Sequence, residues 1–326
     1  MPTLSLCMIV KDEQGNLEVC LKGVKEFVDE IIIVDTGSTD KTLEIARKFT
    51  SKVYAFKWID DFSAARNFSL AKATCEWILV LDADEVIKDM IKIKKIISNT
   101  DADGFFLIQR NYTNNRRRAN WIEDHSKNYE GYVANPILRL FKNRKGITYK
   151  GVVHEVVDFS CKGLNIMRTN IPIYHYYEEK SSNSLEERQL NYLRIAEKSL
   201  AIKPDGRLYA EAAAVLLHFA KDYAKALMYF QKAAEMGYQK NISLEGCAEC
   251  YILLKKYEEA YSVYKKMVSS GYINSTLCNN MANLLIMHKH YRPALKFLKL
   301  ALEKGNQNRE RIIKNIEFIE RRLARL

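Results

Sequence analysis

The stretch WILVLDADEV, residues 77–86, joins an apolar run to a pair of acids. Its first five residues are apolar and favour extended backbone, which predicts a buried strand. Asp82 and Asp84 follow on either side of one alanine. In an open parallel sheet, ligands bind beyond the carboxyl ends of the strands. Two carboxylates in that place can hold a hard divalent cation, which prefers oxygen ligands. An acidic turn after a strand is the structural alternative.

The first half of the chain alternates between strand and helix patterns around this stretch. Continuous apolar strands that alternate with helices predict an α/β domain with a mainly parallel, Rossmann-like sheet covered by helices. Asp35 ends one of these strands, so we expect it to edge the same cleft as Asp82. Ser38 and Thr39 are expected to cap the helix that follows Asp35. Strands are predicted at 4–10, 30–35, 52–56, 77–81 and 104–109, and helices at 17–28, 38–49, 62–73 and 91–98.

The second half, from about residue 181, has a purely helical pattern with an internal period of 34. Small residues at fixed positions let paired helices approach closely, and a glycine ends each second helix. This period resembles the tetratricopeptide repeat. We therefore expect two domains, residues 1–180 and 181–326, joined near the loop-like stretch 178–188, with a capping helix at the C-terminal end. The recurring residues are Tyr223, Tyr257 and Tyr291; Ala226, Ala260 and Ala294; Ala214, Ala248 and Ala282; and Gly237, Gly271 and Gly305.

Composition excludes some classes of protein. The hydrophobic content is 48% and no run reaches the roughly 18 apolar residues that a membrane span needs. The start lacks the features of a signal peptide, so a cytoplasmic protein is expected. A formal net charge of +11 suits anionic partners or a solubilising surface. No nucleic-acid motif accompanies it, so no nucleic-acid partner is expected.

Seven cysteines, an odd number, indicate reduced thiols in the core rather than a disulfide framework. Cys247 and Cys250 form a CxxC motif within a helical pattern. A structural zinc site needs about four ligands, and no second pair lies nearby. Buried thiols are therefore favoured there over a metal or redox site.

Three segments, read in order, carry a family resemblance: CMIVKDE (7–13), IIIVDTGSTDKT (31–42) and DDFSAARNFSLAKATCEWILVLDADE (60–85). Together they resemble the family 2 glycosyltransferases, which have the GT-A fold. The resemblance extends over about residues 4–177. It implies binding of a nucleotide sugar, with Asp35 toward the base and Asp82 toward the ribose.

The same resemblance implies a bound Mg²⁺ or Mn²⁺ ion, with Asp84 as a ligand and Asp82 beside it. Asp61, Arg66 and Asn67 would help to shape the nucleotide pocket. For Arg66, a structural salt bridge is an equally good interpretation.

Two later segments, PILRLFKNRKGITYKGVVHEVV (136–157) and IPIYHYYEE (171–179), resemble one branch of this family. That branch includes enzymes that glycosylate cysteine in bacteriocin peptides, and lipopolysaccharide-core glucosyltransferases. The resemblance implies that Glu155 is the catalytic base and that His175 completes the metal shell. His154 would orient Glu155 or contact phosphate. A surface His–Glu pair and a histidine packed among tyrosines remain the structural alternatives.

The resemblance thus implies a metal-dependent, inverting transferase that uses a nucleoside-diphosphate sugar, with UDP favoured. The sequence has no QxxRW stretch, which processive polysaccharide synthases carry, so a single transfer is expected. The favoured acceptor is a peptide or protein held by the repeats, which also make a homodimer conceivable. A glycan or lipid-linked acceptor, a silent repeat scaffold and a sugar-nucleotidyl transferase are the alternatives, although residues 11–16 lack the glycine- and arginine-rich loop of the last class.

The basic stretch 111–121 is expected to be a long loop near the cleft, either recognising an acidic acceptor or solvated.

Overall fold

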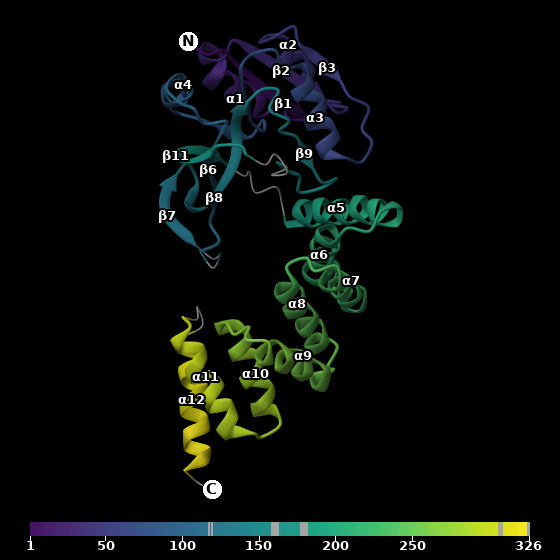
Figure 1. Cartoon of the computed structure of the whole chain (residues 1–326), viewed down its shortest axis with the longest axis vertical. Helices are drawn as coiled ribbons and strands as arrows, with labels where there is room; N and C mark the ends of the chain where they lie inside the picture. The colour runs from purple at the N-terminus through teal and green to yellow at the C-terminus, as the bar shows by residue number, and fades with distance from the viewer. Residues whose placement is uncertain (117, 119, 158–162, 177–181, 306–308, 325–326) are drawn as a thin grey trace. The chain divides into compact units, whose positions relative to one another are not determined.

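The computed structural model (Figure 1) describes residues 1–116, 118, 120–157, 163–176, 182–305 and 309–324. Cys161, Arg117 and the linker residues 178–181, on which some expectations fall, lie outside the described residues. The chain divides into two compact units, Met1–Ser182 and Asn183–Leu326. Each unit is described on its own.

Unit 1 is an α/β domain. Its helical segments are α1 (Leu17–Val24), the 3₁₀ turn η1 (Lys25–Phe27), α2 (Thr42–Arg47), α3 (Phe62–Lys72) and α4 (Met90–Ser98). Its strands are β1 (Leu4–Val10), β2 (Glu30–Asp35), β3 (Val53–Ala55), β4 (Trp77–Val80), β5 (Glu85–Val86), β6 (Gly104–Thr113), β7 (Trp121–Ser126), β8 (Tyr129–Lys142), β9 (Tyr149–Lys150), β10 (Val156–Val157) and β11 (Ile166–His175).

The main sheet has the strand order β3-β2-β1-β4-β8-β6-β11-β5, with β7 paired to β8. The first four strands are parallel neighbours. Strand β8 runs antiparallel to both β4 and β6, whereas β11 is parallel to β6. The predicted fold class is confirmed: a parallel half built from alternating strands and helices is extended into a mixed sheet.

Both faces of the parallel half are covered, which explains why its strands are continuously apolar. Successive side chains of a strand point to opposite faces. In β1, Leu6 and Met8 pack with α1 and α4 in one core cluster, while Cys7 packs with α3 in another. Strand β2 divides its side chains between the two clusters in the same way.

The pairing of β1 brings two acidic segments to one edge of the sheet. Val10 pairs with Asp35 of β2, and Cys7 pairs with Val80 of β4. The chain leaves β2 and β4 at the same end because both strands are parallel to β1. Asp82 and Asp84 therefore follow β4 at the edge where β2 ends, as expected for a ligand site.

One predicted helix start is wrong. Helix α2 begins at Thr42, three residues after Thr39, and neither Ser38 nor Thr39 caps it. Instead, the carboxylate of Asp35 accepts hydrogen bonds from the backbone N–H groups of Gly37 and Ser38. Gly37 has a φ of +110°, which favours glycine. The turn that Asp35 closes delays the helix.

The stretch 111–121 is less loop-like than expected. Strand β6 continues to Thr113, which pairs with Gly131 of β8, and β7 begins at Trp121. Arg116, in the short connection, forms an exposed ion pair with Glu130 at 2.8 Å. Residues 111–113 of the predicted loop therefore belong to a strand, and Trp121 begins the next one.

Unit 2 is helical over the residues described (Figure 1). Helix α5 begins at Ser182, so most of the stretch 178–188 that was predicted as a loop is helical. The helical segments are α5 (Ser182–Ile202), α6 (Gly206–Val215), the π turn η2 (Leu216–Ala220), α7 (Tyr223–Glu235), α8 (Lys240–Leu253), α9 (Tyr257–Ser269), α10 (Ser275–Met287), α11 (Tyr291–Glu303) and α12 (Arg309–Leu323).

The 34-residue period is confirmed in the helices. Tyr223, Tyr257 and Tyr291 are the first residues of α7, α9 and α11, and each of these helices has 13 residues. Close helix contact is achieved through alanines that are completely buried, and left-handed glycines end the three helices. The alanines are Ala226, Ala260 and Ala294, and the glycines are Gly237, Gly271 and Gly305, with φ of +75°, +84° and +76°.

The first repeat departs from the predicted register by one residue. Ala248 and Ala282 are fully buried, as expected, but Ala213 rather than Ala214 is fully buried in α6. The π turn η2 follows α6 and accommodates one extra residue in the helix. That insertion shifts every position before it by one relative to the 34-residue period.

Helix α12 lies after the third glycine, where a capping helix was expected. Ile312 and Ile319 are completely buried against the repeat core, while Ile316 is partly buried. Ile313 is 39% exposed, so the side of α12 that packs on the repeats includes Ile312, Ile316 and Ile319 but not Ile313.

The cysteines of the described residues are free. Cys247 and Cys250 are buried in α8, and burial raises the pKa of each to about 12. Both therefore stay protonated near neutral pH, which fits the expectation of core thiols. Within the described part of the chain, no helix combines the length and apolar character required to cross a membrane.

Glu211 in α6 predicts a pH dependence for unit 2. Burial raises its pKa to about 7, with Arg207 opposing and Asp205 adding to the shift. Between the ordinary pKa of 4.5 and about 7, the folded state keeps a proton that the unfolded state has lost, so stability falls as pH rises. Relative to wild type, Glu211→Gln should therefore gain about 3 kcal/mol between pH 4 and pH 8.

Chemical denaturation of the full chain at the two pH values, followed through the unfolding of unit 2, measures this effect. Glu303→Gln on an exposed position of α11 is the control and should show no such gain. Parallel pH profiles for wild type and Glu211→Gln would contradict the assignment.

Candidate functional site

Asp84 and His175 form a pair at the carboxyl edge of the sheet. Asp84 follows β4, and His175 is the last residue of β11. The antiparallel pairing of β11 with β5 sets His175 opposite Glu85, next to Asp84. His175 Nε2 lies 3.1 Å from Asp84 Oδ2. Residues 91 positions apart in the sequence are thus joined by sheet pairing.

The ring of His175 is held from its other side. His175 Nδ1 lies 2.7 Å from Asn111 Oδ1, while Asn111 Nδ2 donates to Gln109 Oε1. The amide oxygen of Asn111 therefore accepts from Nδ1, which fixes the ring and directs Nε2 at Asp84. Burial alone would lower the pKa of His175, but the hydrogen bond to Asp84 and the nearby acidic charges raise it.

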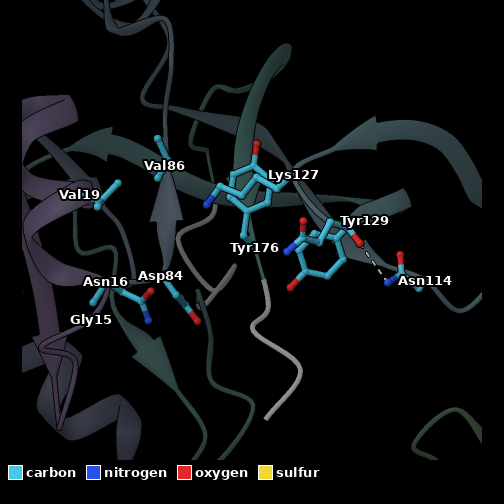
Figure 2. A pocket seen from close by; sticks show the side chains of 11 residues that line it. Gly15, Asn16, Val19, Asp84, Val86, Asn114, Lys127, Tyr129 and Tyr176 are labelled. Carbon is cyan, nitrogen blue, oxygen red and sulfur yellow. Dashed lines mark hydrogen bonds between the residues drawn. The ribbon is translucent and has the colours of Figure 1, made fainter.

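A cavity of about 590 Å³ opens beside Asp84 (Figure 2). Sites for small molecules usually measure roughly 300–1,000 Å³. Figure 2 shows Asn16 near Asp84 and Tyr129 across the cavity from them. The wall combines amides, tyrosine rings, one lysine and one carboxylate, so it can hydrogen-bond a polar ligand. Its residues are Gly15, Asn16, Val19, Ala83, Asp84, Val86, Asn114, Lys127, Asn128, Tyr129 and Tyr176.

Asp82 belongs to a separate network of ion pairs. Arg66 Nη2 donates to Asp82 Oδ1 and Arg139 Nη2 donates to Asp82 Oδ2, each at 2.7 Å. Arg66 Nε also donates to Glu155 Oε1 at 2.5 Å, and Arg139 lies 3.4 Å from Glu85 Oε1. Two buried arginines therefore bridge three carboxylates contributed by distant segments.

In this network, each charged group favours the ionised form of its oppositely charged neighbours, against the effect of burial. Burial alone would raise the pKa of Asp82, but Arg139 and Arg66 hold it well below its ordinary range. Burial raises the pKa of Glu85, although Arg139 opposes the shift. For Arg66, burial alone would lower the pKa, and the charges of Asp82 and Glu155 raise it instead. Asp82 therefore stays ionised and both arginines stay charged.

Three residues predicted for nucleotide binding make bonds to nearby backbone. Asp35 closes its own turn, and Asp61 caps α3 by accepting from the backbone N–H of Ala64 at 3.0 Å. Asn67 accepts from the backbone N–H of Tyr149 at 2.8 Å and donates to its carbonyl at 2.9 Å. Asp35, Asp61 and Asn67 do not line either of the two cavities described in unit 1.

His154 and Glu155 lie between β9 and β10. His154 is exposed and has a φ of +47°, in the left-handed region. Glu155 is mostly buried and lines a second cavity of about 230 Å³. The backbone turn at His154 thus directs the two adjacent side chains into different environments.

The structure brings the predicted residues together in two groups. Asp84 lines the large cavity and pairs with His175, while Asp82, Arg66 and Glu155 form the ion-pair network. The sequence patterns did not predict a role for Arg139, Glu85, Asn111 or Tyr149. Arg139 lies within the stretch 136–157, and Glu85 directly follows Asp84. An acidic residue next to the Asp-x-Asp motif was the available sequence signal for Glu85.

The residues present fit a divalent cation in part. Asp84 and His175 offer an oxygen and a nitrogen close to one another, and both are partly accessible. Asp82 binds Arg66 and Arg139 through one oxygen each, so in this structure it is engaged in ion pairs. Among the described residues, no cluster of three or more potential ligand side chains is present. A bound cation would need further oxygens from its nucleotide ligand.

Unit 1 is thus an α/β domain with a polar cavity at the carboxyl edge of its helix-covered sheet. Residues 5–164 match the profile of Glycosyl transferase family 2. Unit 1 is therefore a family 2 glycosyltransferase domain, and the chain joins it to tetratricopeptide-like repeats.

Curated relatives share parts of the chain. A TPR repeat-containing protein of Synechococcus elongatus is 38% identical over 173 residues, which is 52% of this chain and 39% of the relative. The SPbeta prophage-derived glycosyltransferase SunS of Bacillus subtilis is 26% identical over 237 residues, which is 71% of this chain and 53% of the relative. The chain thus spans about two fifths to one half of the length of these relatives.

Among solved structures, the chain is similar to glucosyl-3-phosphoglycerate synthase from Mycobacterium tuberculosis in complex with Mn²⁺ and uridine-diphosphate-glucose. The two are 14% identical with a TM-score of 0.41, over 61% of this chain and 78% of the other.

Proposed function

We propose that this protein transfers one sugar from a nucleoside-diphosphate donor, with UDP-sugars favoured, to a side chain of a peptide or protein. The observation that carries the proposal is the pairing of His175 with Asp84, a residue that lines the large cavity. The family of unit 1 supports glycosyl transfer as the reaction. The repeats support a macromolecular acceptor, because stacked repeats form extended surfaces that bind peptides and proteins.

The donor is placed with its diphosphate next to Asp84 and His175. The adjoining cavity offers the amides of Asn16, Asn114 and Asn128 as hydrogen-bonding partners. Asp84 and His175 would hold Mg²⁺ or Mn²⁺, which would offset the negative charge of the diphosphate leaving group. Asn111 keeps the His175 ring in place for that role.

Asp82 is proposed to face the ribose from within the arginine network. Arg66 and Arg139 hold its carboxylate in one orientation, so the donor meets a fixed acceptor of hydrogen bonds rather than a mobile one. Asp35, Asp61 and Asn67 contribute by shaping the turn after β2, the start of α3 and its attachment to Tyr149. His154 is exposed beside Glu155 and remains a proposed contact of phosphate.

Glu155 is the proposed base. It takes the proton from the reacting atom of the acceptor as this atom forms a bond to the anomeric carbon. At the same time the bond between the anomeric carbon and the diphosphate breaks, and its electron pair leaves with the diphosphate. Attack opposite the leaving group inverts the anomeric configuration. Arg66 donates to Glu155 Oε1 and so fixes the direction of the carboxylate.

Glu155→Gln tests this assignment. The amide cannot take a proton, so transfer to an acceptor should fall by about 10²–10⁴-fold. Donor binding, measured by calorimetry with a nucleoside diphosphate, should persist. Glu123→Gln, at an exposed position of β7, is the control and should keep wild-type transfer. Wild-type transfer by a folded Glu155→Gln protein would remove Glu155 from the role of base.

A further inference from the structure

Three polar side chains lie in one row across neighbouring strands of the sheet. The register pairs Asn111 of β6 with His175 of β11, and His175 with Glu85 of β5. Gln109 lies two residues before Asn111 on β6, so its side chain points to the same face of the sheet. Strand pairing thus brings together four polar side chains that are contributed by three strands.

These side chains form a continuous chain of hydrogen bonds that ends at the ring of His175. Gln109 Nε2 donates to Glu85 Oε1 at 2.5 Å, and Asn111 Nδ2 donates to Gln109 Oε1 at 3.2 Å. Asn111 Oδ1 lies 2.7 Å from His175 Nδ1. Each amide therefore uses its nitrogen on one side and its oxygen on the other. We call Glu85, Gln109 and Asn111 the polar relay.

The direction of the polar relay is set by Glu85. Both of its oxygens meet groups that can only donate: Oε2 accepts from the backbone N–H of Asp82 at 2.8 Å, and Oε1 lies 3.4 Å from Arg139 Nη2. The carboxylate is therefore an acceptor at both oxygens. Gln109 must then turn its nitrogen toward Glu85 and its oxygen toward Asn111, because the reverse orientation would bring two acceptors together.

The same rule fixes the orientation of Asn111. Its nitrogen faces the oxygen of Gln109, and the backbone carbonyl of Val133, 3.5 Å from that nitrogen, also requires a donor. Asn111 Oδ1 is consequently an acceptor for the ring of His175. The Nδ1 atom of His175 must then carry a proton in order to donate to it.

We propose that Gln109 is a positioning residue that transmits the polarity of Glu85 to His175. The neutral ring is then protonated on Nδ1 and presents the lone pair of Nε2 to Asp84. Histidine binds a metal through a nitrogen of the neutral ring, and the hydrogen bond made by the other nitrogen decides which one is available. The inference rests on the proposed role of Asp84 and His175 in cation binding, and it adds Gln109 and Glu85 as residues that act through Asn111.

Asp84 opposes the polar relay in the absence of a cation. Its Oδ2 lies 3.1 Å from His175 Nε2 and favours a proton on that nitrogen. The effect of the relay on the ring is therefore measured most cleanly where this carboxylate has been replaced. Asp84→Asn supplies such a protein, because an amide can either donate to Nε2 or accept from it.

Nuclear magnetic resonance of Asp84→Asn tests the relay without any cation. Couplings between the ring carbon protons and the ring nitrogens show which nitrogen of the neutral His175 is protonated. We expect the proton on Nδ1, and a larger share on Nε2 once Gln109→Met is added, because the amide of Asn111 can then reorient. A proton mainly on Nε2 in Asp84→Asn, or an unchanged distribution after Gln109→Met, would overturn the inference.

Calorimetric titration of uridine diphosphate measures the consequence for cation binding. Gln109→Met should lower the affinity measured with Mn²⁺ about tenfold, the lower end of the range for groups that hold a metal-binding histidine. The affinity without Mn²⁺ should stay unchanged. Preservation of the whole Mn²⁺-dependent gain in Gln109→Met would overturn the inference.

Asn143→Leu is the matched control for loss of a hydrogen-bonding side chain in unit 1. Asn143 donates to the carbonyls of Ala73 and Cys75 at 3.0 and 2.9 Å. It follows the residue of β8 that pairs with Trp77, the first residue of β4, so it lies at the opposite edge of the sheet from Asp84. This variant should leave both affinities unchanged.

Asn111→Asp separates the polar relay from a packing role of Gln109. An aspartate can only accept, so it keeps the proton on His175 Nδ1 without help from Gln109. Gln109→Met should therefore cost nothing in the Asn111→Asp background, although it costs about tenfold in the wild-type background. An equal loss in both backgrounds would show that Gln109 acts through packing alone and would overturn the inference.

Failure of the inference is distinguishable from failure of the proposed function. If Mn²⁺ tightens binding of uridine diphosphate equally in wild type and Gln109→Met, the inference is overturned and the proposed cation site stands. If Mn²⁺ brings no gain to the wild-type protein, both are overturned.

Discussion

Replacing Asp84 by asparagine is expected to lower donor turnover by about a thousandfold, as judged by release of the nucleoside diphosphate. The substitution keeps the size of the side chain but removes its negative charge from the wall of the large cavity. His175 Nε2 then faces an amide 3.1 Å away instead of a carboxylate. We expect the fold to persist, because Asp84 is partly accessible and its partner can be satisfied by water.

Asp89→Asn is the matched control for this experiment. Asp89 caps α4, five residues after Asp84, and asparagine is an equally good cap. Turnover by the control should equal that of wild type. Wild-type turnover by Asp84→Asn would exclude Asp84 from the donor site.

Replacing Arg139 by methionine is expected to destabilise unit 1 by about 3–5 kcal/mol. Arg139 is 9% exposed and pairs with Asp82 at 2.7 Å and with the fully buried Glu85 at 3.4 Å. Methionine fills similar volume but leaves Glu85 without its cationic partner. The pKa of Glu85 is already raised by burial, so the loss should increase as pH rises and Glu85 ionises.

Urea denaturation of unit 1 within the full chain measures this loss. Arg116→Met breaks an exposed arginine–glutamate pair of similar length and should cost less than about 1 kcal/mol. Adding Glu85→Gln to Arg139→Met should restore part of the stability, because the uncompensated charge disappears. If Arg139→Met and Arg116→Met cost the same, the network around Asp82 is not an important source of stability.

Local patterns predicted the fold well. Apolar runs bounded by polar residues identified β1, β2 and β4, and the period of 34 identified the first residues of α7, α9 and α11. Errors arose where one side chain or one residue changed a local rule. Asp35 closes a turn that delays α2, and the π turn η2 shifts the register of α6.

The sequence pointed to individual candidate residues but not to the contacts between them. Ordered motifs pointed to Asp82, Asp84, Glu155 and His175. The contacts between them depend on sheet pairing across long sequence separations, which no local pattern encodes. Arg139 binds Asp82 across 57 residues because β8 inserts between β4 and β6. No sequence pattern marks Tyr149, whose buried hydroxyl has no hydrogen-bond partner among the described residues.

Asp84 and His175 are proposed to bind the diphosphate of a nucleotide through a divalent cation. Calorimetric titration of a nucleoside diphosphate, with and without Mn²⁺, tests it most directly. We predict that Mn²⁺ tightens binding by wild-type protein at least about tenfold, or 1.4 kcal/mol, and that Asp84→Asn loses this gain. Equal affinity with and without Mn²⁺, or an undiminished gain in Asp84→Asn, would contradict the claim.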